Sequence, residues 1–197
     1  HWHRLDDRRR GPQGILDAID SLQGVALEWH VWEQDILPAR VQDYESSHLD
    51  MLLVTGALQW QGVPKSSAKG GRITFFRPDN VHLLAPRPEP LTDTLSDTIR
   101  DALSRGGALF FRDLLAQTET FGPALLEALW ALVWNGEVSN DSLAPLRSTH
   151  RHKSKPPRGK RRGRRRGVPR HGSRELPGSE GRWWLIRHED RDEVEHA

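Results

Sequence analysis

A run of basic residues from Arg147 to Arg174, called the basic run below, is the densest concentration of one chemistry in the chain. It contains 13 Lys and Arg residues and no Asp or Glu. Each cation that neutralises a phosphate releases counterions, so such a segment attracts DNA or RNA strongly, salt-dependently and without regard to base sequence. Its phrase RRGRRR also suits entry into a minor groove or folding against RNA. The basic run therefore predicts binding to a nucleic-acid backbone.

The candidate binding residues are the cations of the basic run and three from an earlier loop and the strand that follows it. They are Arg147, Arg151, Lys153, Lys155, Arg158, Lys160, Arg161, Arg162, Arg164, Arg165, Arg166, Arg170 and Arg174, with Lys65, Lys69 and Arg72. Six Pro and Gly residues lie between 156 and 169, and such a segment cannot bury apolar surface, so we expect it to be disordered when unbound. A solvated low-complexity loop, or a patch like a nuclear-import signal, is the alternative interpretation.

The charge of the remaining chain has the opposite sign. The whole chain has a formal net charge of +2, but outside the basic run 16 Lys and Arg face 27 Asp and Glu. A concentrated basic element on an acidic body has a local field that selects its partner. We therefore expect a polyanionic partner, DNA or RNA, and no membrane.

Several classes of chemistry have no support in the sequence. The chain has no cysteine, which excludes disulfides, thiol catalysis and Cys-based metal sites. The motifs GxxxxGK[ST], GxSxG, HExxH and GxGxxG are absent, and the histidines of the basic run have cationic neighbours that repel a metal ion. We assign no catalytic residue, metal or cofactor to this chain. No apolar run approaches the ~18 residues that cross a bilayer, so we expect a soluble, cytoplasmic protein.

The spacing of apolar residues predicts two similar units. Helices are expected at about 12–23, 28–38 and 47–55, followed by a ribbon in which RITFF is one strand and GVPKSSAKGG is the loop. Three helices and a ribbon with a basic tip form the winged-helix pattern, whose third helix usually enters a groove. The phrase APRPEPLTDT has three prolines and predicts a stiff linker. Further helices are expected at about 94–105, 110–118 and 121–135, with strands at GALFF, EVSN and GRWWLIR.

The predicted fold class is α+β, with two tandem winged-helix units. The expected boundaries are 1–85 for the first unit, 86–94 for the linker, 95–187 for the second unit with a wing insertion at 147–174, and 188–197 for a charged tail. An internal repeat at an offset of 80 residues supports this division, with Gly56 matching Gly136. Both glycines are expected to end a helix in the left-handed conformation. The repeat places the basic run in the connection between Asn140 and Glu180, where the second unit would have its wing.

Eight tryptophans are many for 197 residues. Trp130 and Trp134 lie four residues apart in an apolar helix, so core packing is expected for both. Trp183 and Trp184 point to opposite faces of a strand. One of the two is therefore expected to be exposed, where it could stack on a base or dock a neighbouring domain, and we favour docking.

The phrases GILDAIDSLQGVAL, ILPARVQDY, ALWALVWNGEVSNDSLAPLR and GRWWLI together resemble the large helicase-related (Lhr) family. The resemblance covers about residues 11 to 187 and is to the carboxy-terminal extension that follows the helicase core in bacterial members. It implies a parent protein that is an ATP-dependent 3′-to-5′ helicase of DNA repair, using ATP and Mg in its motor, with tandem winged-helix modules. The chain departs from the family pattern because it lacks the motor motifs and, after GRWWLIR, does not continue into the glycosylase-like modules.

Three functions follow from these observations. The first is a nucleic-acid-binding accessory region of a repair helicase, which binds single-stranded or forked DNA and contacts neighbouring helicase domains. The second is a protein-docking scaffold within a larger helicase, which suits an acidic body. The third is a truncated part of a winged-helix DNA glycosylase. Because the chain starts at His1 within a charged phrase, we expect it to be a fragment of a longer polypeptide.

Overall fold

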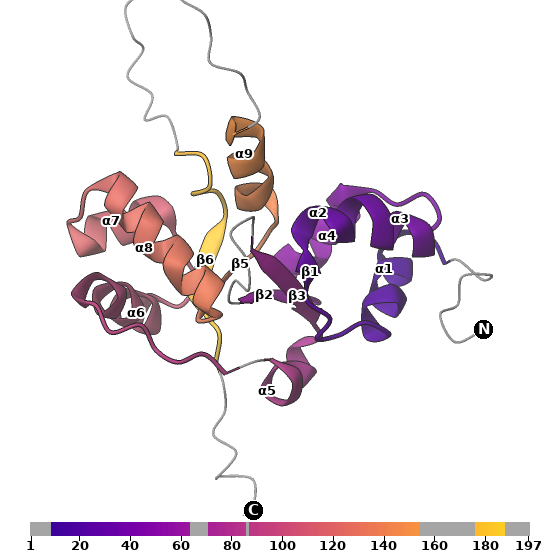
Figure 1. The fold of residues 1–197 in the computed structure, drawn as a ribbon, viewed down its shortest axis with the longest axis horizontal. Helices are drawn as coiled ribbons and strands as arrows, with labels where there is room; N and C mark the ends of the chain where they lie inside the picture. The colour runs from indigo at the N-terminus through magenta and orange to yellow at the C-terminus, as the bar shows by residue number, and fades with distance from the viewer. Residues whose placement is uncertain (1–8, 64–70, 86, 154–175, 188–197) are drawn as a thin grey trace, which may run out of the picture.

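The computed structural model describes residues 9–63, 71–85, 87–153 and 176–187. Two groups of helices lie on opposite sides of a central layer of strands (Figure 1). We call residues 9–85 the N-terminal half and residues 87–187 the C-terminal half. Among the described helices, none is long and apolar enough to span a bilayer.

The N-terminal half contains helices and a three-stranded antiparallel sheet in the order β1-β3-β2. Its elements are α1 (Gly11–Asp20), β1 (Leu27–Glu28), α2 (Trp29–Val31), a π-helical turn (Trp32–Ile36), α3 (Leu37–Arg40), α4 (Ser46–Val54), β2 (Gln59–Val63), β3 (Arg72–Phe76), a 3-10 turn (Pro78–Asn80) and α5 (Val81–Leu84). Helix α1 buries Ile15 and Ile19, and α4 buries Leu49 and Leu52. Trp32 is buried among them and its indole N–H donates to the carbonyl of Ile73 at 3.2 Å.

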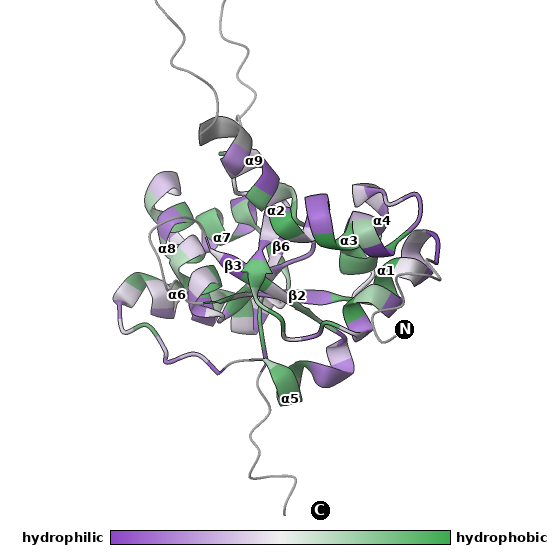
Figure 2. Ribbon diagram, turned by 45° about the vertical axis from the view of Figure 1, so that its right-hand side comes forward, coloured by the Kyte–Doolittle hydropathy of each residue, from purple (hydrophilic) through white to green (hydrophobic). Residues whose placement is uncertain are grey.

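The C-terminal half repeats this strand arrangement in a sheet of order β4-β6-β5, with α9 between β5 and β6. Its elements are α6 (Thr94–Gly106), β4 (Leu109–Phe110), α7 (Phe111–Thr118), α8 (Gly122–Asn135), β5 (Val138–Asn140), α9 (Ala144–Lys153) and β6 (Arg182–Leu185). The carboxylate of Asp93 caps α6 by accepting from the Ser96 backbone N–H at 2.9 Å. Hydrophobic and hydrophilic residues alternate along the helices (Figure 2), as expected when each helix buries one face.

The two halves share one continuous hydrophobic core. Where β2 meets α8, the chain has glycines, and a Cβ at Gly62 would overlap the Val133 carbonyl while one at Gly71 would overlap the Trp134 ring. Gln61 donates through Nε2 to the Gly136 carbonyl at 2.8 Å, and the Ser139 hydroxyl donates to the Trp60 carbonyl at 2.5 Å. The halves are therefore packed against each other and hydrogen-bonded.

The predicted α+β class and the six expected helices are confirmed, with boundaries within a few residues. The expected single connection from Asn140 to Glu180 is wrong at its beginning, because residues 144–153 form α9. Apolar Leu143 and Leu146 draw this segment into the core, at 0% and 4% exposure. Helix α5 was also not predicted. The domain boundaries at 85 and 95 remain a prediction.

Both glycines of the internal repeat have the expected conformation. Gly56 has φ of +73° and Gly136 has φ of +85°. Each donates its backbone N–H at 3.0 Å to the carbonyl three residues before it, Leu53 in one case and Val133 in the other. The left-handed conformation predicted at these two helix ends is therefore confirmed.

Candidate nucleic-acid interface

Helix α9 carries the beginning of the basic run. It starts directly after β5, and a turn in which the Ser142 N–H donates to Asn140 Oδ1 at 3.0 Å leads into it. Leu143, which directly precedes α9, and Leu146 in its first turn are buried in the core. The basic run therefore begins on a helix that is packed against the folded body.

Arg147 ties α9 to the N-terminal half. Its Nε donates to Glu33 Oε2 at 2.9 Å, a second guanidinium nitrogen donates to Asp50 Oδ2 at 2.6 Å, and the third donates to Glu33 Oε1. The side chains of Arg147 and Glu33 are 18% and 10% exposed. Burial alone would lower the pKa of Arg147, but the hydrogen bonds to both carboxylates outweigh it and raise the pKa.

The surroundings of Arg147 are themselves ordered. Asp50 also accepts from the Leu143 backbone N–H at 3.4 Å, and Tyr44 donates its hydroxyl to Glu33 Oε1 at 3.4 Å. Burial, followed by the negative charge of Glu33, raises the pKa of Tyr44. The structure thus places Arg147 in an ion-pair network between the halves, and its predicted contact with phosphate remains a prediction. The sequence signal that could have found this is the hydrophobic pair around it, Leu143 and Leu146.

The chain that returns from the basic run is held against α9. The Gly178 N–H donates to the Ser148 hydroxyl at 2.8 Å, and this hydroxyl contacts Glu180 Oε2 at 2.9 Å. The indole N–H of Trp130 donates to the Gly178 carbonyl at 3.0 Å. The segment that leaves the body and the segment that returns to it therefore lie side by side (Figure 1).

The other predicted site residues fall into three groups. Arg72 is half-buried at the start of β3, where its backbone pairs with Glu28. Arg151 and Lys153 belong to the last turn of α9, and only their backbone is described. The remaining residues lie outside the described chain: Lys65, Lys69, Lys155, Arg158, Lys160, Arg161, Arg162, Arg164, Arg165, Arg166, Arg170 and Arg174.

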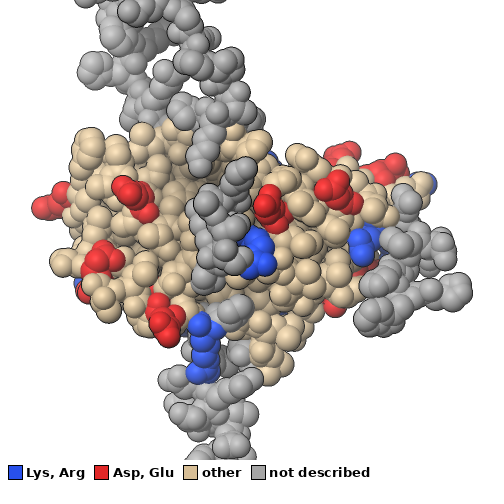
Figure 3. Space-filling view, viewed as in Figure 1, with Lys and Arg blue, Asp and Glu red and all other residues tan. Residues whose placement is uncertain are grey.

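The third long helix of each half has no positive side chain. Helix α4 has the sequence SSHLDMLLV and α8 has GPALLEALWALVWN, with no Lys or Arg in either. On the face shown in Figure 3, acidic side chains are scattered over the described surface, and the few basic ones do not form a patch. Groove-reading helices contact phosphates through cations. Helices α4 and α8 therefore lack the cations with which a groove-reading helix contacts phosphates.

The tryptophans divide largely as expected. Trp130 and Trp134 stack with ring centroids 5.3 Å apart and pack against the core, which confirms the prediction for both. Trp183 is fully buried, whereas Trp184 is only half-buried and lines a cavity between the halves. Trp184 is thus the accessible member of the pair.

Comparison with known proteins agrees with this architecture. Residues 1–78 match the family model of the winged-helix domain of the large helicase-related protein. The chain is 35% identical to the Lhr helicase/uracil glycosylase of Escherichia coli K12 over 94% of its length. It is 34% identical to the Lhr helicase/probable uracil glycosylase of Mycolicibacterium smegmatis over 75% of its length. The chain spans 13% and 11% of the lengths of these two relatives. The chain belongs to the large helicase-related family.

Proposed function

We propose that this chain is a nucleic-acid-binding part of an Lhr-type ATP-dependent DNA repair helicase, and that the basic run holds the phosphate backbone. The observation that carries the proposal is the anchoring of the run at both ends, by Arg147 on one side and by the contact between Ser148 and Gly178 on the other. Both ends of the run are thereby joined to the folded body. In the sequence its 13 cations are concentrated between positions 147 and 174.

The distribution of charge supports the same proposal. With Arg147 paired to Glu33 and Asp50, the other 12 cations of the basic run have no acidic residue within the run to neutralise them. The acidic body repels phosphates, so an approaching polyanion is directed toward the run. Such binding is independent of base sequence and suits a helicase that moves along any strand.

The finer parts of the proposal concern the substrate and the parent protein. We propose forked or single-stranded DNA, because a backbone-binding segment accepts both single strands and the adjoining duplex. ATP and Mg belong to the motor of the parent helicase, which would act in the cytoplasm. Since the chain spans a small share of relatives named helicase/uracil glycosylase, our proposal for these residues is limited to binding.

A salt series with one charge variant tests the proposal. Arg161, Arg162, Arg164, Arg165 and Arg166 are changed together to Ser, and affinity for fluorescent single-stranded, duplex and forked DNA is measured. The slope of log affinity against log salt should decrease by about 0.9 per lost contact on duplex and about 0.7 on single strands. The melting temperature should hardly change, because residues 154–175 contain Val168 as their one aliphatic residue.

The matched control replaces the same five arginines with Lys. This variant keeps the charge, so it should retain the parent salt slope, while a loss equal to that of the Ser variant would indicate recognition specific to guanidinium. If the Ser variant keeps the affinity and the salt slope of the parent, the backbone-binding proposal is wrong. The docking-scaffold function then becomes the better one.

A further inference from the structure

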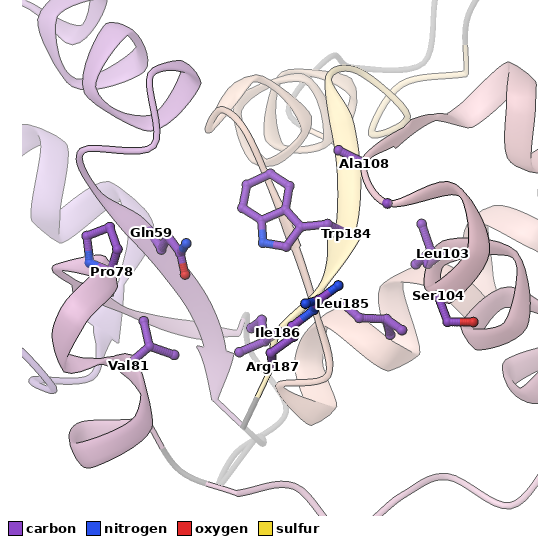
Figure 4. Close-up of a pocket in the computed structure, with 11 residues that line it drawn as sticks. Gln59, Pro78, Val81, Leu103, Ser104, Ala108, Trp184, Leu185, Ile186 and Arg187 are labelled. Atoms are coloured by element: carbon purple, nitrogen blue, oxygen red, sulfur yellow. The ribbon is translucent and has the colours of Figure 1, made fainter. Parts of the chain in front are cut away.

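A cavity of about 490 Å³ lies where the two halves meet. Gln59 of β2, Pro78 and Val81 line it from the N-terminal half, and Ser104 of α6, Trp184 of β6 and Arg187 line it from the C-terminal half. Figure 4 shows the Trp184 ring directed into the space between these walls, with Gln59 facing it and Arg187 at the end of β6. The cavity therefore combines an aromatic surface, hydrogen-bonding groups and a cation.

The position of Trp184 follows from the alternation of β6. Trp183 points inward, is fully buried and meets the Trp130 ring edge-on at 5.6 Å. Trp184 pairs with Ser139 across the sheet and points to the opposite face. The Ile186 N–H donates to the Glu137 carbonyl at 2.9 Å and continues this pairing past the strand. The ring is thus carried by a rigid central strand.

The N-terminal sheet has a different residue at the matching position. In the first sheet Leu27 of β1 pairs with Ile73 of β3, and in the second sheet Leu109 of β4 pairs with Trp183 of β6. This aligns β3 with β6, so Thr74 corresponds to Trp184. Thr74 is 1% exposed, and its cross-strand neighbour Gln61 bonds the C-terminal half. The packing of the two halves therefore buries the face of β3 that carries Thr74. On the matching face of β6, the large ring of Trp184 is only half-buried and borders a cavity.

The charge of the cavity differs from that of the body. Among the described residues that line it, Arg187 is the one charged side chain, and no carboxylate is present. On an otherwise acidic body, this wall admits an anion beside an aromatic ring. Cavities of this size accommodate small organic ligands, and aromatic side chains such as an indole stack on nucleobases.

We propose that this cavity binds one unpaired nucleobase of a single strand, stacked on Trp184, with the adjoining phosphate at Arg187. Gln59 and Ser104 offer hydrogen bonds to the edge of the base. The proposal deepens the proposed function, since it adds a base-binding site to backbone binding by the basic run. Stacking is tolerant of base identity, so the site distinguishes unpaired from paired bases and carries no sequence preference.

Saturation-transfer NMR with a deoxydinucleotide tests the site without relying on the basic run. The base protons should receive saturation from the parent chain and from Phe121→Ala, which removes another exposed aromatic ring (77% exposed). The signal should be lost with Trp184→Ala and largely kept with Trp184→Phe. Competition by a single-stranded oligonucleotide should abolish it, whereas persistence during competition would mean that free nucleotides are the ligand and the strand proposal is wrong.

Affinity for single strands provides the second measurement. Trp184→Ala should weaken binding of a single-stranded oligonucleotide about tenfold and leave duplex binding and the salt slope unchanged. An oligonucleotide of abasic sites should bind the parent and the variant equally. Equal dinucleotide signals from parent and Trp184→Ala would overturn the inference, even if the five-arginine variant shows that the basic run binds phosphates. The opposite result is weaker binding by Trp184→Ala and unchanged binding by the five-arginine variant. It would support base binding in the cavity and would show that the proposal of backbone binding by the basic run is wrong.

Discussion

The two halves of the molecule differ most in what connects the last two strands of each sheet. Residues 64–71 join β2 to β3, whereas residues 141–181 join β5 to β6 and include α9 and the whole basic run. The sheets keep the same order, β1-β3-β2 and β4-β6-β5. A scaffold that tolerates a long insertion at this point can gain a binding element while its core stays the same.

The insertion also uses the other half as its support. Arg147 of α9 meets Glu33 and Asp50, which lie before β2 in the N-terminal half. The rings of His150 and Trp29 approach each other edge-on at 5.7 Å along the same contact. The N-terminal half, with its short connection, therefore acts as the platform on which the C-terminal insertion begins.

Replacement of Arg147 should have the largest effect on the contact between α9 and the N-terminal half. Arg147→Met leaves Glu33 and Asp50 without their shared cation, and breaking a largely buried ion pair from one side costs about 3 kcal/mol of unfolding free energy. Because the partners lie in different halves, urea unfolding should also become less cooperative. The measurement is equilibrium unfolding followed by far-UV and tryptophan signals.

The triple variant Arg147→Met, Glu33→Gln, Asp50→Asn is the matched control. It removes all three charges together, so much of the lost stability should return. A single variant as stable as the parent would show that Arg147 does not hold the insertion in place. Phosphate binding by Arg147, as the sequence suggested, would then be the better assignment.

Gly56 and Gly136 follow equivalent helices, α4 and α8, but have different surroundings in the two halves. A Cβ at Gly56 meets no atom within 4 Å, while one at Gly136 would lie 2.7 Å from Gln61 Nε2 and 3.2 Å from the Gly62 carbonyl oxygen. Gly56→Ala should therefore cost about 1 kcal/mol for its left-handed backbone alone. Gly136→Ala should cost about 2 kcal/mol, because it adds crowding where the halves meet. Thermal unfolding of the two variants measures this difference in stability. Equal losses of stability would mean that the contact between the halves accommodates a Cβ at Gly136 at no cost in free energy.

The helices and both glycines could be predicted because they depend on local patterns. Period-3.6 spacing around Ile15 and Ile19, and glycines after apolar helices, are determined within a few residues of sequence. Helix α9 was missed because its last seven residues, RSTHRHK, are polar and merge with the basic run in composition. Its anchor is tertiary, since Leu143, Leu146 and Arg147 find their partners only when the halves pack.

The candidate sites show the same limit. The basic run was evident from charge alone, but the pairing of Arg147 with Glu33 joins positions 114 residues apart. The cavity at Trp184 has walls from β2, α6 and β6, which no spacing rule brings together. Alternation along β6 correctly predicted one accessible tryptophan, and the structure identifies which one it is.

The smallest expected effect concerns Glu137, which ties residues 89–91 of the linker to the C-terminal half. Arg100 donates to Glu137 at 2.6 Å and to the Leu91 carbonyl at 2.7 Å, while Asn135 donates to Glu137 and to the Glu89 carbonyl, each at 2.7 Å. Burial alone would raise the pKa of Glu137, but the hydrogen bonds from Arg100 and Asn135 outweigh it and lower the pKa below its ordinary value of 4.5. The folded state therefore resists protonation at this carboxyl more than the unfolded state does.

The sign of the pH dependence follows from that lowered pKa. The stabilisation is present above pH 4.5 and is lost as the pH falls through the folded-state pKa, because the unfolded chain takes up the proton first. Melting temperatures between pH 7 and pH 3 should decline less steeply for Glu137→Gln than for the parent, and Glu137→Gln should be the less stable of the two at pH 7. Glu127→Gln, an exposed change on α8 that removes one negative charge, is the control and should follow the parent curve. Parallel curves for the parent and Glu137→Gln would show that the Glu137 carboxylate does not stabilise the linker. The contacts of Glu137 would then no longer count as a difference between the C-terminal and the N-terminal half.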